Sequence, residues 1–213
     1  MIAAAAPEIL KESAQKLIRK ANELDKDVDR GDKNAAEQDI KDIAPEVEKH
    51  IDLGSAIAKN IPDDPDRAER VREHVNDIRN LEPKVAEAAR RALANPSDAK
   101  AKEEHKDRVG DLKAASQGLV NAALMNPEDE LLENAARIDN KVKQAKDLQD
   151  AKKIPELNEK VKDIARDVKN QVKVANNYAR KTRDPRKRQN LLQASKDLAD
   201  ALNELVGAMG VVM

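Results

Sequence analysis

Apolar residues recur along this chain at alternating steps of three and four positions, and polar or charged residues fill most of the positions between them. This spacing places the apolar residues on one face of an α-helix. The pattern predicts seven amphipathic helices separated by short polar turns. The first runs from about Pro7 to Asp29 and the second to about Lys59. The other five begin near Asp64-Pro65, Asn95-Pro96, Asn126-Pro127, Ile154-Pro155 and Asp184-Pro185.

Prolines at positions 65, 96, 127, 155 and 185 follow one another at intervals of 31, 31, 28 and 30 residues. Four of them follow Asn or Asp, which predicts an N-cap residue and then a proline in the first helical turn. The Asn or Asp oxygen accepts a free backbone N–H there, and the proline needs no N–H of its own. The intervals predict helices of about 25–30 residues, each on the order of 40 Å long.

Two further prolines, Pro45 and Pro83, lie inside helical patterns, where a proline removes a hydrogen bond and kinks the helix. Both occur in an apolar–X–Pro–charged–Val pentad, and the pentads follow one another by 38 residues. This is the pattern of an internal repeat, or of chance in a repetitive composition. Together with the many alanines in the predicted core, Pro45 and Pro83 also predict a bundle that opens locally to admit an amphipathic helix.

Predicted loops of only three to six residues favour antiparallel neighbours in an up-down bundle. Seven helices exceed what one four-helix core holds. We therefore predict an all-α protein with two up-down four-helix-type bundles, in series or sharing a helix. The expected division lies near Met125-Asn126-Pro127, which gives an N-terminal bundle at 1–125 and a C-terminal bundle with a basic turn at 126–213.

The composition restricts the chemistry of the chain. Charged residues make up 38%, there is no Phe, Trp or Cys, and Tyr178 is the one tyrosine. A core of Ala, Leu, Val and Ile suits closely packed helices better than a wide catalytic pocket. The absence of Cys excludes disulfides, zinc–thiolate sites and thiol nucleophiles. No segment has the pattern of a signal peptide or the length of a membrane span, so we expect a soluble, cytoplasmic protein.

The histidines His50, His74 and His105 lack partners at metal-ligand spacing, and we expect His74 and His105 at exposed or bundle-edge positions. The acidic pairs Asp63/Asp64 and Glu128/Asp129 stand at predicted helix starts, where negative charge favours the helix dipole. Four aspartates near Gly31 (Asp25, Asp27, Asp29 and Asp32) lack the spacing of an EF-hand. We therefore expect no catalytic residue, no cofactor and no metal, and hence no enzyme.

Positive charge gathers in one part of the chain. Residues 151–190 hold 13 Lys/Arg against 5 Asp/Glu, and six of the cations fall within nine positions around the predicted turn before the last helix. This basic turn consists of Arg180, Lys181, Arg183, Arg186, Lys187 and Arg188. This turn can bind an acidic filament surface or anionic lipid, or it can simply be solvated. Nucleic acid is not expected, because stacking aromatics are missing apart from Tyr178, which the apolar stripe predicts in the core with its hydroxyl at the edge.

The stretch 71–123 contains Leu81-Glu82-Pro83-Lys84-Val85, then Ala86-Glu87-Ala88-Ala89-Arg90, then Asn95-Pro96. This stretch resembles the helical-bundle repeats of the vinculin/α-catenin family, and the start at Asp184-Pro185 is similar to helix starts in that family and in talin rods. The resemblance implies an actin-linked cytoskeletal adaptor of cell adhesion made of tandem four-helix bundles, without catalysis. We therefore expect protein partners, bound by the helix-in-groove contacts described above, with F-actin as a candidate. The helix after Asn95-Pro96 carries only aliphatics where family members usually bear aromatics, so no particular binding groove is carried over.

Overall fold

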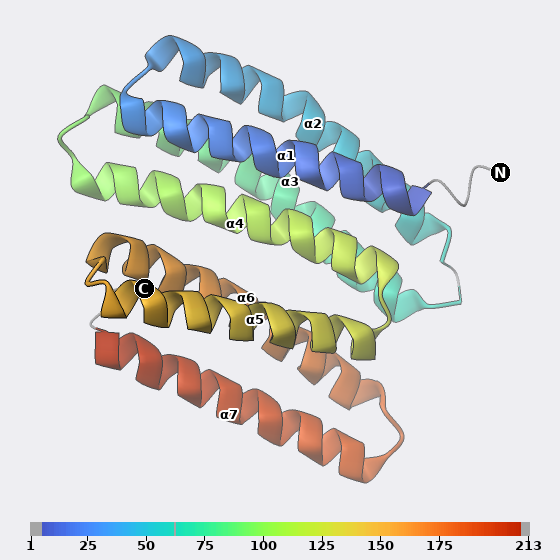
Figure 1. Cartoon of the computed structure of the whole chain (residues 1–213). Helices are drawn as coiled ribbons and strands as arrows, with labels where there is room; N and C mark the ends of the chain where they lie inside the picture. The colour runs from blue at the N-terminus through green and yellow to red at the C-terminus, as the bar shows by residue number, and fades with distance from the viewer. Residues whose placement is uncertain (1–5, 62, 210–213) are drawn as a thin grey trace. The chain divides into compact units, whose positions relative to one another are not determined.

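A computed structural model describes residues 6–61 and 63–209 of the chain. This described part contains seven α-helices and no strand (Figure 1). The helices are α1 (Ala6–Arg30), α2 (Lys33–Lys59), α3 (Pro65–Ala94), α4 (Ala99–Leu124), α5 (Pro127–Asp150), α6 (Ile154–Lys181) and α7 (Pro185–Met209). The predicted all-α class and the number of helices are confirmed.

Three of the four predicted N-caps are present. The side-chain oxygen of Asp64, Asn126 or Asp184 accepts a backbone N–H two or three residues later, at 2.9 Å in each case. The following prolines begin α3, α5 and α7. Each of these helix starts therefore follows from local chemistry, because the cap satisfies one of the backbone N–H groups that a first turn leaves free.

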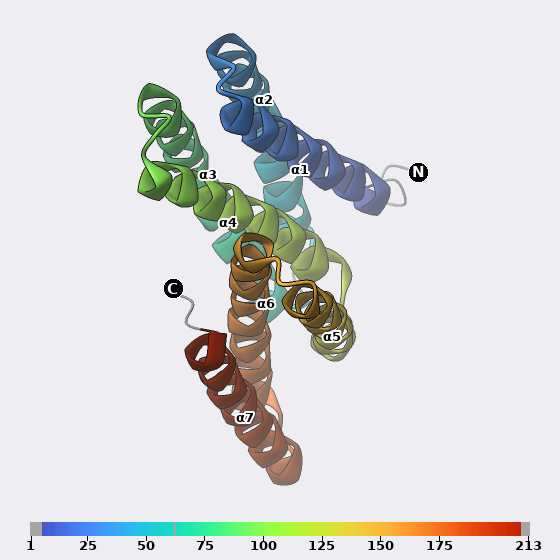
Figure 2. The same ribbon diagram turned by 60° about the vertical axis from the view of Figure 1, so that its left-hand side comes forward.

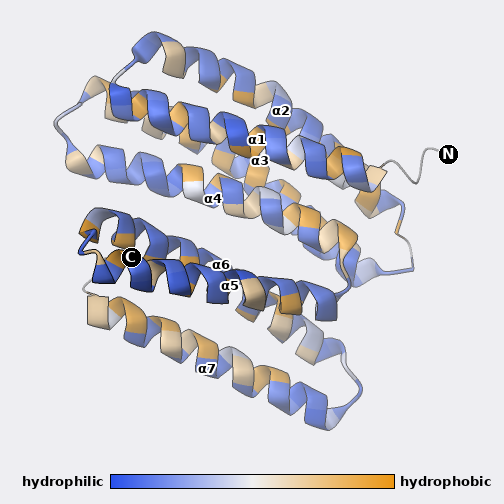
Figure 3. Cartoon of the chain, in the orientation of Figure 1, coloured by the Kyte–Doolittle hydropathy of each residue, from blue (hydrophilic) through white to orange (hydrophobic). Residues whose placement is uncertain are grey.

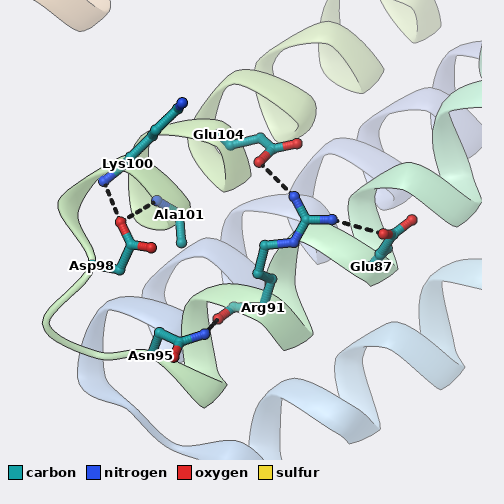
Figure 4. Close-up of polar contacts among 7 residues, drawn as sticks. All are labelled: Glu87, Arg91, Asn95, Asp98, Lys100, Ala101 and Glu104. Atoms are coloured by element: carbon teal, nitrogen blue, oxygen red, sulfur yellow. Dashed lines mark hydrogen bonds and ion pairs between the residues drawn. The ribbon is translucent and has the colours of Figure 1, made fainter.

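The prediction for Asn95 is wrong, because this residue ends α3 instead of starting α4 (Figure 4). Its Nδ2 donates to the carbonyl oxygen of Arg91 at 3.3 Å. The N-cap of the next helix is Asp98, whose Oδ1 accepts the backbone N–H groups of Lys100 at 2.9 Å and Ala101 at 3.1 Å. A carboxylate is a stronger acceptor than an amide oxygen, so the nearby aspartate caps α4.

Pro45 and Pro83 lie inside α2 and α3, as predicted. Both side chains are exposed. The carbonyl that each proline leaves without an N–H partner therefore lies on the solvent side of its helix, where it is accessible to water. The predicted kinks stay predictions.

The chain divides between Leu124 and Met125 into two compact units. In the first unit, α1 to α4 contact one another in sequence order and α4 returns to contact α1, so the helices form a closed ring. Its core is aliphatic, and the largest side chains are wholly buried. They include Leu10, Leu17, Leu24, Ile78, Leu112 and Leu119. That each unit folds independently stays a prediction.

The second unit contains three helices in its described part. α6 lies between α5 and α7 and packs against both (Figure 2), whereas the described residues of α5 and α7 do not pack against each other along their lengths. The main cluster of buried apolar residues is small and comprises Ile138, Ala145, Leu157, Val161, Ile164 and Val168. The apolar side chains of α7 reach this core but remain partly exposed. The second unit is therefore an open layer, whereas the first is closed.

The expectation that His105 is exposed or at a bundle edge is wrong. His50 and His105 both have 0% exposure inside the first unit. His50 Nε2 lies 3.0 Å from Ser116 Oγ, and His105 Nε2 lies 3.4 Å from Asp25 Oδ1. Each buried imidazole therefore fills the core beside a polar side chain from another helix, which spacing along the sequence does not reveal.

His74 is half-buried on α3, and its ring packs against Gly118 of α4. A Cβ at position 118 would come within 2.4 Å of the His74 ring. Glycine at this position therefore allows the imidazole ring to lie directly on the backbone of α4.

Candidate functional site

The basic turn predicted from the sequence is formed by the last turn of α6, the short connection after it and the first turn of α7. Five of its six cations are exposed, and Lys187 is half-buried. The structure thus brings all six predicted residues to one end of the second unit. Their roles nevertheless differ.

Arg188 holds the end of α6. Its Nε donates to the carbonyl oxygen of Ala179 at 3.1 Å, and its Nη2 donates to that of Thr182 at 2.8 Å. The last carbonyls of a helix have no partner within the helix, so a guanidinium beside them satisfies them and favours the negative end of the dipole. Arg188 therefore stabilises the turn itself.

Lys187 joins the three helices of the second unit at this end. Its Nζ bonds to the carboxylate of Glu128 in the first turn of α5, and it lies 4.9 Å from the centroid of the Tyr178 ring. The Tyr178 hydroxyl donates to the same carboxylate. The bond to Glu128, and then that to Tyr178, raises the pKa of Lys187, and the same Lys187 contact lowers the pKa of Glu128.

Sequence reasoning missed Glu128 as a partner of this turn. Lys187 and Glu128 are 59 residues apart, and their contact depends on how α5 and α7 lie against α6. Tyr178 is half-buried, and its hydroxyl bonds to Glu128 at the surface, in line with the predicted position of the hydroxyl at the edge of the core.

The remaining members of the turn, Arg180, Lys181, Arg183 and Arg186, present exposed cationic side chains. Beyond them, the start of α7 forms a shallow surface depression with an exposed leucine, Leu192, between Arg188 and Lys196. No acidic residue lies between Pro185 and Lys196. This end of the second unit therefore offers positive charge and one apolar side chain to an anionic surface.

The aspartates near Gly31 have structural partners. Asp25 lies beside His105, Asp29 pairs with Lys106 at 3.3 Å, and Asp32 caps α2 by accepting the N–H of Ala35 at 3.0 Å. Within residues 6–61 and 63–209, no group of three or more His, Cys, Asp or Glu side chains is arranged to hold a metal ion. The described part also contains no helix long and apolar enough to cross a membrane.

One buried carboxyl has a strongly shifted pKa. Burial, followed by a hydrogen bond with Asp27, raises the pKa of Asp39 to about 6. The two aspartates lie between α1 and α2, and Lys20 is 4.0 Å from Asp39. Because a carboxyl buried against another carboxyl favours its protonated form, ionisation of Asp39 near neutral pH destabilises the fold at this point.

The chain is similar to a protein of Dictyostelium discoideum described as "Probable vinculin", with 27% identity over 211 residues. The similarity covers 95% of this chain and 24% of that protein, so the chain spans about a quarter of the relative's length. No protein-family model matches the chain, and no solved structure matches it. Together with the seven helices, the similarity suggests a vinculin-like helical protein.

Proposed function

We propose that this chain is a non-catalytic, cytoskeleton-associated adaptor of the vinculin type, which binds protein partners through packed helices. The observation that carries the proposal is the similarity to "Probable vinculin" over 95% of the chain. The all-helical fold supports it, since long packed helices suit a scaffold better than a catalytic pocket. In the proposed layout the first unit is a complete up-down bundle, and the second is completed by a partner.

The basic turn is the proposed contact with F-actin. Its exposed side chains, Arg180, Lys181, Arg183 and Arg186, are suited to an acidic filament surface. Lys187 and Arg188 hold the turn together, so we assign them a positioning role. Contacts between exposed charges weaken as salt rises, because the Debye length shortens.

Co-sedimentation with actin filaments tests this proposal. We expect the chain to pellet with filaments, and Arg183→Glu/Arg186→Glu to weaken pelleting at least ten-fold. The matched control is Lys152→Glu/Lys153→Glu, which reverses two exposed cations in the turn at the other end of α6. Equal effects of both double variants, or no pelleting of the unaltered chain, would contradict the assignment.

An anionic membrane surface is the second candidate. It is favoured by Leu192, which is 47% exposed and lies between Arg188 and Lys196. An apolar side chain surrounded by cations suits the interface of a bilayer. Flotation with vesicles containing phosphatidylserine tests it: Leu192→Ser lowers vesicle binding and leaves actin pelleting unchanged if membranes are the partner.

A further inference from the structure

The apolar face of the second unit is covered on one side only. In the first unit nearly all apolar side chains of the core are buried. In the second, five side chains of α7 that pack on the core stay partly exposed: Leu198, Leu202, Leu205, Val206 and Met209. Figure 3 shows apolar positions recurring along α7, with a hydrophilic start. Soluble proteins rarely leave a continuous apolar stripe exposed unless it binds something.

The contacts of α5 show which of its sides is uncovered. Arg137 and Lys141 reach Asp167 of α6, at 3.6 Å and 2.8 Å. Ala135 and Val142 lie on the other side of the buried Ile138, three residues before it and four after it. Both are exposed, Val142 by 41%. One flank of α5, beside its contact with α6, therefore exposes two apolar side chains.

α7 has a corresponding strip. Ser195 is its one buried residue within the described part. Ala194, Ala201 and Ala208 are exposed at intervals of seven residues, and each of the first two precedes a core-facing leucine by four positions. Residues seven apart lie on one helix face, and alanine lets a neighbouring helix approach closely. Lys187 and Glu128, which bond to each other, stand seven residues before Ala194 and Ala135, so the two strips lie on the same side of the unit. We call the alanines of α7 together with Ala135 and Val142 of α5 the open face.

The first unit shows what completes such a layer. There α4 contacts both α3 and α1, which makes the ring closed. The second unit has counterparts of α1, α2 and α3 in α5, α6 and α7, and its described part has no helix in the fourth position. One added helix, seated against α5 and α7, would cover the open face.

The charges beside the open face indicate which charges the added helix should carry. From Asp197 to Met209 the chain has three acidic residues and no Lys or Arg. Asp197 and Glu204 follow Ala194 and Ala201 by three positions, so they border the alanine strip. Both are exposed. A helix seated here meets negative charge along the edge that it turns toward α7.

We propose that the open face binds one amphipathic helix of a protein partner, with an aliphatic stripe and with Lys or Arg along the edge next to α7. This inference rests on the proposed adaptor function and names one of its contacts. It assigns the contact to α5 and α7, away from the exposed arginines of the basic turn. The bound helix buries the partly exposed leucines of α7.

Two synthetic peptides of about 22 residues test the chemistry of the occupant. They share one leucine–alanine stripe, and they carry either Lys or Glu along both edges. Titrated against the full chain by fluorescence anisotropy, the Lys-edged peptide is expected to bind at least ten-fold more tightly than the Glu-edged one. Asp197→Lys/Glu204→Lys is expected to reverse this preference, because it reverses the charge beside the alanine strip.

Matched variants test the location. Ala135→Glu places a charge in the open face, and Ala136→Glu places the same charge on the adjacent, equally exposed residue outside it. On α7, Ala201→Glu and the exposed Asn203→Glu form a second such pair. We expect at least a ten-fold loss of Lys-edged peptide binding for Ala135→Glu and Ala201→Glu, and less than a two-fold change for the controls. Circular dichroism verifies that all four variants keep their helices.

Three results would overturn the inference: no saturable binding of the Lys-edged peptide, equal losses within each matched pair, or a dimer of the unaltered chain that Ala201→Glu abolishes. The last would make a second copy the occupant, and sedimentation equilibrium detects it. Failure here is distinguishable from failure of the proposed function. Actin pelleting depends on the basic turn, so Ala135→Glu and Ala201→Glu leave it unchanged.

Discussion

The two units of this chain are built from helices of similar length and composition, and they bury their apolar stripes to different extents. In the first, four helices close a ring around a core of wholly buried leucines such as Leu112 and Leu119. In the described part of the second, three helices leave the leucines of α7 partly exposed. An amphipathic stripe therefore specifies that a helix packs, but the number of neighbours decides how much stability the packing gives.

The same substitution made in both units should separate them most clearly. Leu119 has 0% exposure in the first unit, whereas Leu202 is partly exposed in the second. We expect Leu119→Ala to lower the free energy of unfolding by about 3 kcal/mol and Leu202→Ala by about 1 kcal/mol. Urea denaturation followed by circular dichroism measures both. Equal losses would show that the second unit is as well packed as the first.

The histidines lie in the first unit only, so acid should distinguish the units. Burial lowers the pKa of His50 from 6.5 to about 4. Between pH 6.5 and pH 4, His50 therefore binds a proton in the unfolded chain but not in the folded unit. The free energy of unfolding falls over this range by up to roughly 3 kcal/mol. His50→Gln, which keeps a partner for Ser116, should remove this slope. Denaturation between pH 7 and pH 4 tests it, best in an Asp39→Asn background.

Asp39 acts in the opposite direction within the same unit. Its pKa of about 6 lies above the ordinary 3.8, so the folded state holds a proton that the unfolded chain releases. Its contribution to stability is present below pH 3.8 and is lost as pH rises to 6. Asp39→Asn removes the carboxyl that burial and Asp27 disfavour and should stabilise the first unit at pH 7 by about 2 kcal/mol. The gain is smaller than the pKa shift alone implies, because the ion pair with Lys20 is lost as well. A destabilised Asp39→Asn variant would mean that Lys20 outweighs Asp27.

The smallest expected effect separates structural from accessible cations in the second unit. Arg188→Ala removes the bonds to the carbonyls of Ala179 and Thr182 and should cost about 1 kcal/mol. Arg183→Ala, at an exposed position of the same turn, should cost less than about 0.5 kcal/mol. Thermal unfolding of both variants measures the difference. If Arg183→Ala were the more destabilising, the assignment of Arg188 as structural and Arg183 as accessible would be wrong.

Local chemistry was predictable from the sequence, and long-range pairing was not. The apolar stripes, the caps at Asp64, Asn126 and Asp184, and the interior prolines each depend on residues within one or two turns. The predicted N-cap at Asn95 was wrong because Asp98 offers a stronger acceptor three residues later. The burial of His105 was not predicted because its partner, Asp25, lies on another helix.

The candidate site shows the same limit. The cluster of cations was visible as charge density, but the sequence does not show that Lys187 meets Glu128 or that Arg188 caps α6. The open face was hidden for a related reason. The stripe of α7 is as regular as that of any other helix, and only the arrangement in space shows that nothing in the described part covers it.

The contact between His74 and Gly118 restricts how homologous sequences can diverge. Since a Cβ at position 118 would come within 2.4 Å of the imidazole, a larger residue at this position requires the His74 ring to move. A homologue with alanine at the position of Gly118 should carry a side chain smaller than histidine at the position of His74. The two positions are thus expected to covary. Such covariation in an alignment would indicate that α3 and α4 lie equally close in the homologues.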